Sequence, residues 1–195
     1  MKFKLWIVLT GWLILSAACL KAQKNVVKVN ALSALVRTVN IQYEHVINTS
    51  SSFQIGLFYT WNNRTSIAIW PVTSDEATFS GFGITPEYRF YLSETESPQG
   101  NYIAPFFRYV SLNVNIKKLD QQSMRLERQV DFNSFGGGVI IGRQWTFKKR
   151  IDLDVFVGPA YYMGITDEQP GTEDFKMKQF NDFEVRAGIC LGVRF

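Results

Sequence analysis

Two aspartates, Asp152 and Asp154, stand two positions apart and have the spacing that most directly suggests chemistry. In an extended strand such side chains point to the same face, and paired carboxylates can act as a general acid and base. The alternative is a salt-bridge network, which brings carboxylates together and shifts their titration without catalysis. We expect the network, because basic and acidic residues are nearly balanced on the corresponding strand faces.

The single histidine and a cysteine near the end of the chain are the other candidates for reactive groups. For His45 to serve a lipid-modifying enzyme, it would need a serine nucleophile and an acidic partner beside it. Its place late in a predicted strand instead indicates an interfacial residue that faces lipid. Cys190 stands among small residues and is expected to pack rather than react. The sequence therefore predicts no enzyme, no catalytic residue, no cofactor and no metal site.

The segment 183–195, FEVRAGICLGVRF, alternates between apolar and charged or small residues. A transmembrane barrel turns the apolar face of such a strand toward lipid. The segment resembles the last strand of outer-membrane barrel proteins, which ends on an aromatic residue that the assembly machinery recognises. The resemblance implies an assembly signal made of Ile189, Leu191, Val193 and Phe195.

Eight strand-like segments follow residue 22, and short and long connections alternate between them, except that the first connection, near Arg37, is also short. The expected strands are 26–36, 39–47, 53–62, 81–92, 102–116, 134–147, 151–164 and 183–195. Connections 48–52, 93–101 and 148–150 are short, whereas 63–80, 117–132 and 164–179 are long. Bacterial barrels have an even number of strands, short periplasmic turns and long outer loops. We therefore predict an all-β fold, an eight-stranded antiparallel up-and-down transmembrane barrel, with weakened strand pairing at Pro86.

The interior of an eight-stranded barrel is just wide enough to be filled by side chains. The predicted inward face carries a group of charged residues. They are Glu44, Glu87, Arg89, Arg108, Asp152, Asp154, Glu184, Arg186 and Arg194. Because an unpaired buried ion costs several kcal/mol, we expect ion pairs across the lumen, in particular between Asp152 or Asp154 and the arginines of the last strand. The first strand has no clear inward face.

Residues 1–22 are expected to be a signal peptide, since two lysines precede an apolar core and small residues follow it. Cleavage after Ala22 would leave residues 23–195 as the barrel domain. The alternative is lipidation of Cys19 at a weak lipobox, in which the preferred leucine stands one place too early, at Leu15.

Charge and composition narrow the choice of partners. Removing the three lysines of the signal lowers Lys+Arg from 21 to 18, against 17 Asp+Glu. The remaining net charge near +1 provides no electrostatic footprint for nucleic acid. The expected location is the bacterial outer membrane, and the expected partners are outer-membrane lipid and the barrel assembly machinery. The sequence does not identify an extracellular or membrane protein partner.

Five stretches, at 28–47, 81–92, 101–109, 136–147 and 151–162, together with the last strand, resemble a family of small outer-membrane barrels of unknown function from Bacteroidota. The resemblance implies a fold and a location but no activity. We expect a structural or interaction barrel that presents long outer loops. A narrow solute or ligand conduit is the alternative, and a lipid-modifying enzyme comes third. The alternative fold is a soluble barrel with its apolar face turned inward.

Overall fold

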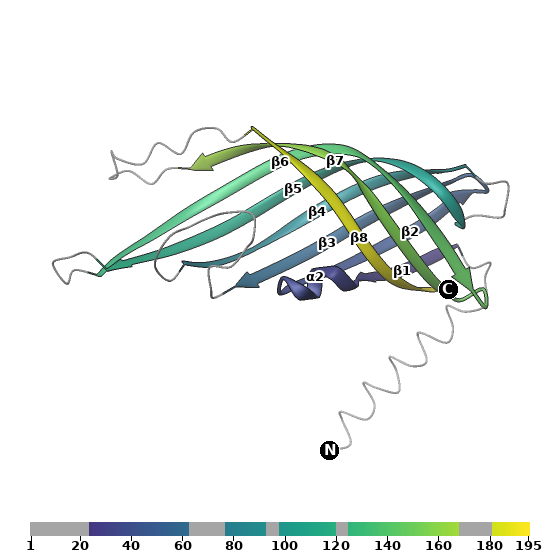
Figure 1. Ribbon diagram of the computed structural model, residues 1–195, viewed down its shortest axis with the longest axis horizontal. Coiled ribbons are helices and arrows are strands. Elements are labelled where there is room, and N and C mark those ends of the chain that lie inside the picture. Colours follow the sequence, from purple (N-terminus) through teal and green to yellow (C-terminus); the bar gives the residue numbers. More distant parts are fainter. Residues whose placement is uncertain (1–23, 63–76, 93–97, 120–124, 168–180) are drawn as a thin grey trace, which may run out of the picture.

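The computed structural model describes residues 24–62, 77–92, 98–119, 125–167 and 181–195. These residues form a closed barrel in which each strand pairs antiparallel with its neighbour in sequence and β1 pairs with β8 (Figure 1). The strands are β1 Asn25–Asn30, β2 Thr38–Asn48, β3 Ser51–Asn62, β4 Ala77–Tyr91, β5 Gly100–Leu119, β6 Arg125–Phe147, β7 Ile151–Asp167 and β8 Asn181–Arg194. The predicted eight-stranded up-and-down barrel is confirmed. The predicted signal peptide lies outside the described residues.

The second half of the expected first strand is a short helix, so that part of the prediction is wrong. Helix α2 spans Ala31–Leu35 and leaves β1 only six residues long. Asn30 starts the helix, because its side-chain oxygen accepts a hydrogen bond from Leu32 N at 3.0 Å, and asparagine is a favoured helix cap. Arg37 then adopts a left-handed backbone with φ of 53°, which turns the chain into β2.

Strands β5 and β6 extend far into the segment predicted as a long loop, 117–132. Their register continues to the pair Leu119↔Arg125, so most of that predicted loop is strand. The 23 residues of β6 extend over roughly 75 Å at about 3.3 Å per residue. Figure 1 shows this hairpin projecting beyond the other strands. A strand outside an apolar belt needs no apolar face, which explains why the polar composition misled the prediction. Similarly, β4 begins at Ala77 and β7 continues to Asp167.

The polarity of the wall is opposite to that of a soluble barrel. Large apolar side chains such as Leu57, Ile141 and Leu191 are more than half exposed on the outer face. Inside, Lys28 and Arg89 are completely buried. Polar groups inside and apolar groups outside are the arrangement of a membrane barrel, so the alternative of a soluble barrel with its apolar face inward does not fit. Within the described residues, no helix is long and apolar enough to cross a membrane.

Connections at the end of the barrel opposite α2 are short. Strands β2 and β3 are joined by Thr49 and Ser50 alone, and β6 and β7 by residues 148–150. Pairing is interrupted at Pro86, as expected, but only on one side. On the β5 side the pairing stops at Ile84↔Tyr109 and resumes at Glu87↔Phe106, whereas the pairing with β3 runs through Pro86.

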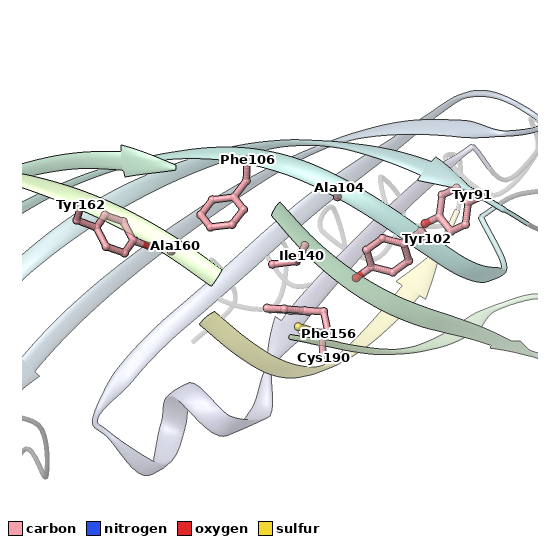
Figure 2. Close-up of a cluster of buried hydrophobic side chains, with 9 residues drawn as sticks. All are labelled: Tyr91, Tyr102, Ala104, Phe106, Ile140, Phe156, Ala160, Tyr162 and Cys190. Atoms are coloured by element: carbon pink, nitrogen blue, oxygen red, sulfur yellow. The ribbon is translucent and has the colours of Figure 1, made fainter. Parts of the chain in front are cut away.

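Part of the barrel interior is an apolar and aromatic cluster (Figure 2). It consists of Tyr91, Tyr102, Ala104, Phe106, Ile140, Phe156, Ala160, Tyr162 and Cys190. Glycines make room for two of its rings, because a Cβ at Gly142 would collide with Tyr102 and one at Gly188 with Phe156. The lumen is therefore packed by rings as well as by charges.

Candidate functional site: the charged layer inside the barrel

Asp154 of β7 is the centre of a buried polar layer. Its Oδ2 lies 2.7 Å from Arg89 Nη1 of β4 and 3.0 Å from Lys28 Nζ of β1. Tyr102 of β5 donates a hydrogen bond to Oδ1 at 2.7 Å. The carboxylate therefore contacts two cations and one hydroxyl from three other strands. Such pairing offsets part of the large cost of removing an ion from water.

Glu44 of β2 holds the other side of the same layer. Its Oε2 lies 2.7 Å from Lys28 Nζ, and its Oε1 accepts hydrogen bonds from the hydroxyls of Tyr91 at 2.7 Å and Ser52 at 2.5 Å. Gln144 of β6 joins the two halves, because its Oε1 accepts a hydrogen bond from Lys28 Nζ at 2.8 Å and lies 3.0 Å from the Tyr91 hydroxyl oxygen. Residues from at least five strands thus meet in one layer.

Glu87 connects this layer to β8. Its Oε1 lies 2.7 Å from Arg89 Nε, and its Oε2 lies 2.9 Å from Arg186 Nη1. The Arg186 guanidinium also lies 4.4 Å from the centre of the Phe106 ring and 4.8 Å from that of Phe156. These distances are within the range of cation–π attraction. Three cations, Lys28, Arg89 and Arg186, therefore face three carboxylates, Glu44, Glu87 and Asp154, and the formal charges of this group cancel.

A second ion pair stands nearer the short-turn end of the barrel. Arg194 Nη2 of β8 lies 3.0 Å from Asp152 Oδ1 of β7. It also donates to the Thr146 hydroxyl at 2.6 Å and to the Pro98 carbonyl at 3.1 Å. The Arg194 side chain thus ties β6, β7 and the β4–β5 connection together.

Eight of the nine charged residues predicted for the lumen lie on the inner face, but not all in one cluster. Asp152 meets Arg194 of the last strand, whereas Asp154 meets Arg89 and Lys28 instead. Arg108 lies apart from the central layer and donates to the Thr85 hydroxyl at 3.1 Å. Glu184 shares the inward phase but is exposed.

Sequence reasoning missed Lys28, Gln144 and the two tyrosines that complete the layer. Lys28 was missed because the expected first strand, 26–36, covers both β1 and α2. The alternation of β1 is therefore obscured by helical residues. Within the six residues of β1, the period of two is clear, since Val26, Lys28 and Asn30 are buried and Val27 and Val29 are exposed.

The two aspartates considered as an acid and base pair belong to different ion-pair groups. Asp152 and Asp154 form ion pairs with different cations. His45 lies on the outer face, with its Nδ1 2.8 Å from Asn25 Oδ1, and Cys190 is buried in the lumen. Across the described ranges, no group of three histidine, cysteine or acidic residues could hold a metal ion.

Comparison with known proteins places the sequence in a family. The family model described as "Protein of unknown function (DUF3575)" matches residues 7–185. The chain belongs to this family. No curated protein matches this DUF3575 chain.

Two solved structures resemble the DUF3575 chain at low sequence identity. One is the N-terminal β-barrel domain of Pseudomonas aeruginosa OprF, with 10% identity and a TM-score of 0.35, covering 90% of this chain and 100% of that one. The other is the β domain of the Bordetella autotransporter BrkA, with 10% identity and a TM-score of 0.49, covering 88% of this chain and 69% of that one. The barrel assignment rests on the strand pairing of the chain itself.

Proposed function

We propose that this chain is an integral barrel of the bacterial outer membrane, with a closed lumen and a structural or interaction role. The observation that carries the proposal is the buried, charge-balanced layer around Asp154 inside a wall whose outer face is apolar. Exposed apolar side chains would cost free energy in water, and ions buried in a soluble core would cost desolvation free energy. Both are ordinary in a barrel surrounded by lipid.

The position of the layer supports the proposed closed lumen. Lys28, Glu44, Arg89, Gln144 and Asp154 are completely buried, and they reach one another from β1, β2, β4, β6 and β7. Side chains that meet across the lumen in this way favour an interior without a continuous water path. An interior of eight strands is expected to be filled in this way.

The β5–β6 hairpin supplies a surface for interaction. It projects from the end of the barrel opposite the short turns, which corresponds to the outside of the cell if the short turns are periplasmic. At the base of the projection, Tyr109 donates to Asn133 Oδ1 at 3.0 Å, and Asn113 donates to Asp131 Oδ1. These hydrogen bonds between the two strands favour an ordered surface on which a partner could bind.

Outer-membrane lipid and the barrel assembly machinery are the proposed membrane partners. Ile189, Leu191 and Val193 of the proposed assembly signal are exposed on the outer face of β8. The backbone of Phe195 exchanges hydrogen bonds with Asn25, at 2.9 and 3.1 Å. The last residues of the chain therefore both present an apolar face and help to join β8 to β1.

Membrane fractionation tests the proposed placement. The full chain, expressed with its first 22 residues in a Gram-negative host, should stay in the outer-membrane fraction after a carbonate wash. It should also migrate differently in gels before and after boiling. An epitope inserted in residues 120–124 should bind antibody on intact cells, whereas one placed after Lys149 should not. Release of the chain by carbonate would overturn the proposal.

A further inference from the structure

Arg143 of β6 is a cation on the apolar outer face of the barrel wall. Its side chain is exposed, whereas the next residue, Gln144, points inward and is completely buried. Its neighbours in register are Asn101 of β5 and Val155 of β7, which are also exposed and carry no negative charge. Arg143 forms no ion pair with any residue that the structure describes. Because a charge that faces hydrocarbon costs free energy unless it is compensated, this position calls for an anionic partner.

The Arg143 side chain is directed toward the short-turn end of the barrel. Its guanidinium carbon lies 5.3 Å from the centre of the Trp145 ring, two residues nearer the end of β6. Long basic side chains near the edge of a bilayer turn toward the headgroups in this way, and tryptophan is enriched at that boundary. The connection 148–150 follows, and its three basic residues are exposed. In the proposed membrane placement, the Arg143 guanidinium therefore lies near the headgroups of the periplasmic leaflet.

An apolar groove adjoins Arg143 on the same face of the wall. Its volume is about 490 Å³, within the range of about 300–1,000 Å³ that is usual for ligand sites. Tyr102, Gly142 and Phe156 are neighbours in register at its base. The side chains of Tyr102 and Phe156 are buried in the lumen (Figure 2), so the base of the groove is strand backbone. The side chains at its rim are exposed on the outer face and include Leu92, Ile103, Ile141, Arg143, Val155 and Val157.

A single cation beside an apolar groove matches a lipid that carries one negative charge next to its hydrocarbon. A guanidinium can bind two phosphate oxygens through parallel hydrogen bonds, and phosphate is the charge that membrane lipids hold at the level of the headgroups. From these observations, and resting on the proposed membrane placement, we propose that Arg143 and the adjoining groove bind one anionic glycerophospholipid. Its phosphate contacts Arg143 beside Trp145. One acyl chain lies along Ile103, Ile141 and Val157, toward the middle of the membrane.

Native mass spectrometry tests the proposal with dioleoyl phosphatidylglycerol, and dioleoylglycerol is the match that lacks the phosphate. The full-chain barrel, released from nonionic micelles, should retain one phosphatidylglycerol more tightly than one dioleoylglycerol. Arg143→Gln should weaken phosphatidylglycerol binding at least about tenfold, the effect of losing one charge-assisted hydrogen bond, and should leave dioleoylglycerol binding unchanged. Arg37→Gln is the matched control, because Arg37 is exposed after α2 at the opposite end of the barrel.

A second variant tests the groove without changing the lumen. Ile141→Trp should fill the groove and abolish binding of both lipids, whereas Leu57→Trp, on the outer face of β3, should bind as the unmodified chain does. Heat-modifiable migration establishes folding for each variant. Phosphatidylglycerol binding that is no tighter than dioleoylglycerol binding, or that is unchanged in Arg143→Gln or Ile141→Trp, would overturn the proposed site.

The connection between β4 and β5 provides a further test of the counterion. It contains Glu94 and Glu96, which lie outside the described residues and close in sequence to Leu92 of the groove. The double variant Glu94→Gln/Glu96→Gln should bind phosphatidylglycerol as the unmodified chain does. A marked increase would show that these carboxylates already neutralise Arg143 and would overturn phosphate as its partner. Membrane fractionation is independent of these results, so failure of the lipid site and failure of the membrane placement are distinguishable.

Discussion

Arg89 Nη1 lies 2.7 Å from Asp154 Oδ2 inside the barrel, although the two residues are 65 positions apart in the chain. The pair joins β4 to β7 across the lumen, and the Arg89 guanidinium also lies 4.4 Å from the centre of the Tyr102 ring. One contact therefore links strands that are not neighbours in the wall. Long-range ion pairs of this kind connect separate parts of the barrel wall through its interior.

Replacing Asp154 with leucine should destabilise the barrel strongly. The change leaves Lys28 and Arg89 facing each other without their shared carboxylate, and breaking a buried pair in this way costs about 3–5 kcal/mol. Urea unfolding in detergent, followed by loss of heat-modifiable migration, measures the change. Asp131→Leu is the control, because Asp131 is exposed near the projecting hairpin. Equal stability of the two variants would contradict a structural role for the central layer.

A double-mutant cycle on Lys28 and Glu44 should reveal coupling. Lys28→Met alone leaves Glu44 with Arg89 Nη1 at 4.0 Å as its nearest remaining cation. Glu44→Gln in the same chain removes the carboxylate that needs compensation, so the double variant should be more stable than the sum of the single effects predicts. We expect a coupling of about 0.5–3 kcal/mol. Strict additivity of the unfolding free energies would show that the contact contributes no specific energy.

An arginine on the outer face should impair membrane insertion rather than lumen packing. Leu191 is 56% exposed on β8, and an arginine at the membrane midplane costs about 2–4 kcal/mol. Leu191→Arg should lower the yield of folded barrel in lipid vesicles, whereas Leu191→Phe should retain it. Folding yields that are the same for both variants would mean that this face does not contact lipid.

Two variants of Phe195 should separate the role of its ring in assembly from the role of its backbone in closing the barrel. Phe195→Ala removes the ring but keeps the backbone pair with Asn25, whereas Phe195→Pro also removes the N–H that donates to Asn25 O. If the ring is the recognition element, the alanine variant should already reduce the amount of assembled barrel in cells. Its refolding into detergent should stay normal, and only the proline variant should lose stability in vitro. Normal assembly of the alanine variant in cells would remove the role of the ring.

The sequence was sufficient to predict the barrel because alternation of apolar and polar residues with a period of two specifies which face of each strand meets lipid. The same alternation placed Asp152 and Arg194 inside, where they pair. Partners such as Arg89 for Asp154 could not be predicted, because register and barrel curvature decide which strands meet across the lumen. Helix α2 was missed because Asn30 acts as a cap only when β1 stops there. The extension of β5 and β6 was missed because the sequence of a polar strand resembles that of a loop.

Electrical recording from the purified full chain in planar lipid bilayers tests the closed lumen most directly. With Lys28, Glu44, Arg89, Gln144 and Asp154 meeting across the interior, inserted barrels should show no stepwise conductance. Insertion is verified on the same sample by its heat-modifiable migration after recovery from the lipid. Reproducible, uniform conductance steps from the unmodified chain would contradict a closed lumen and would establish a conduit instead.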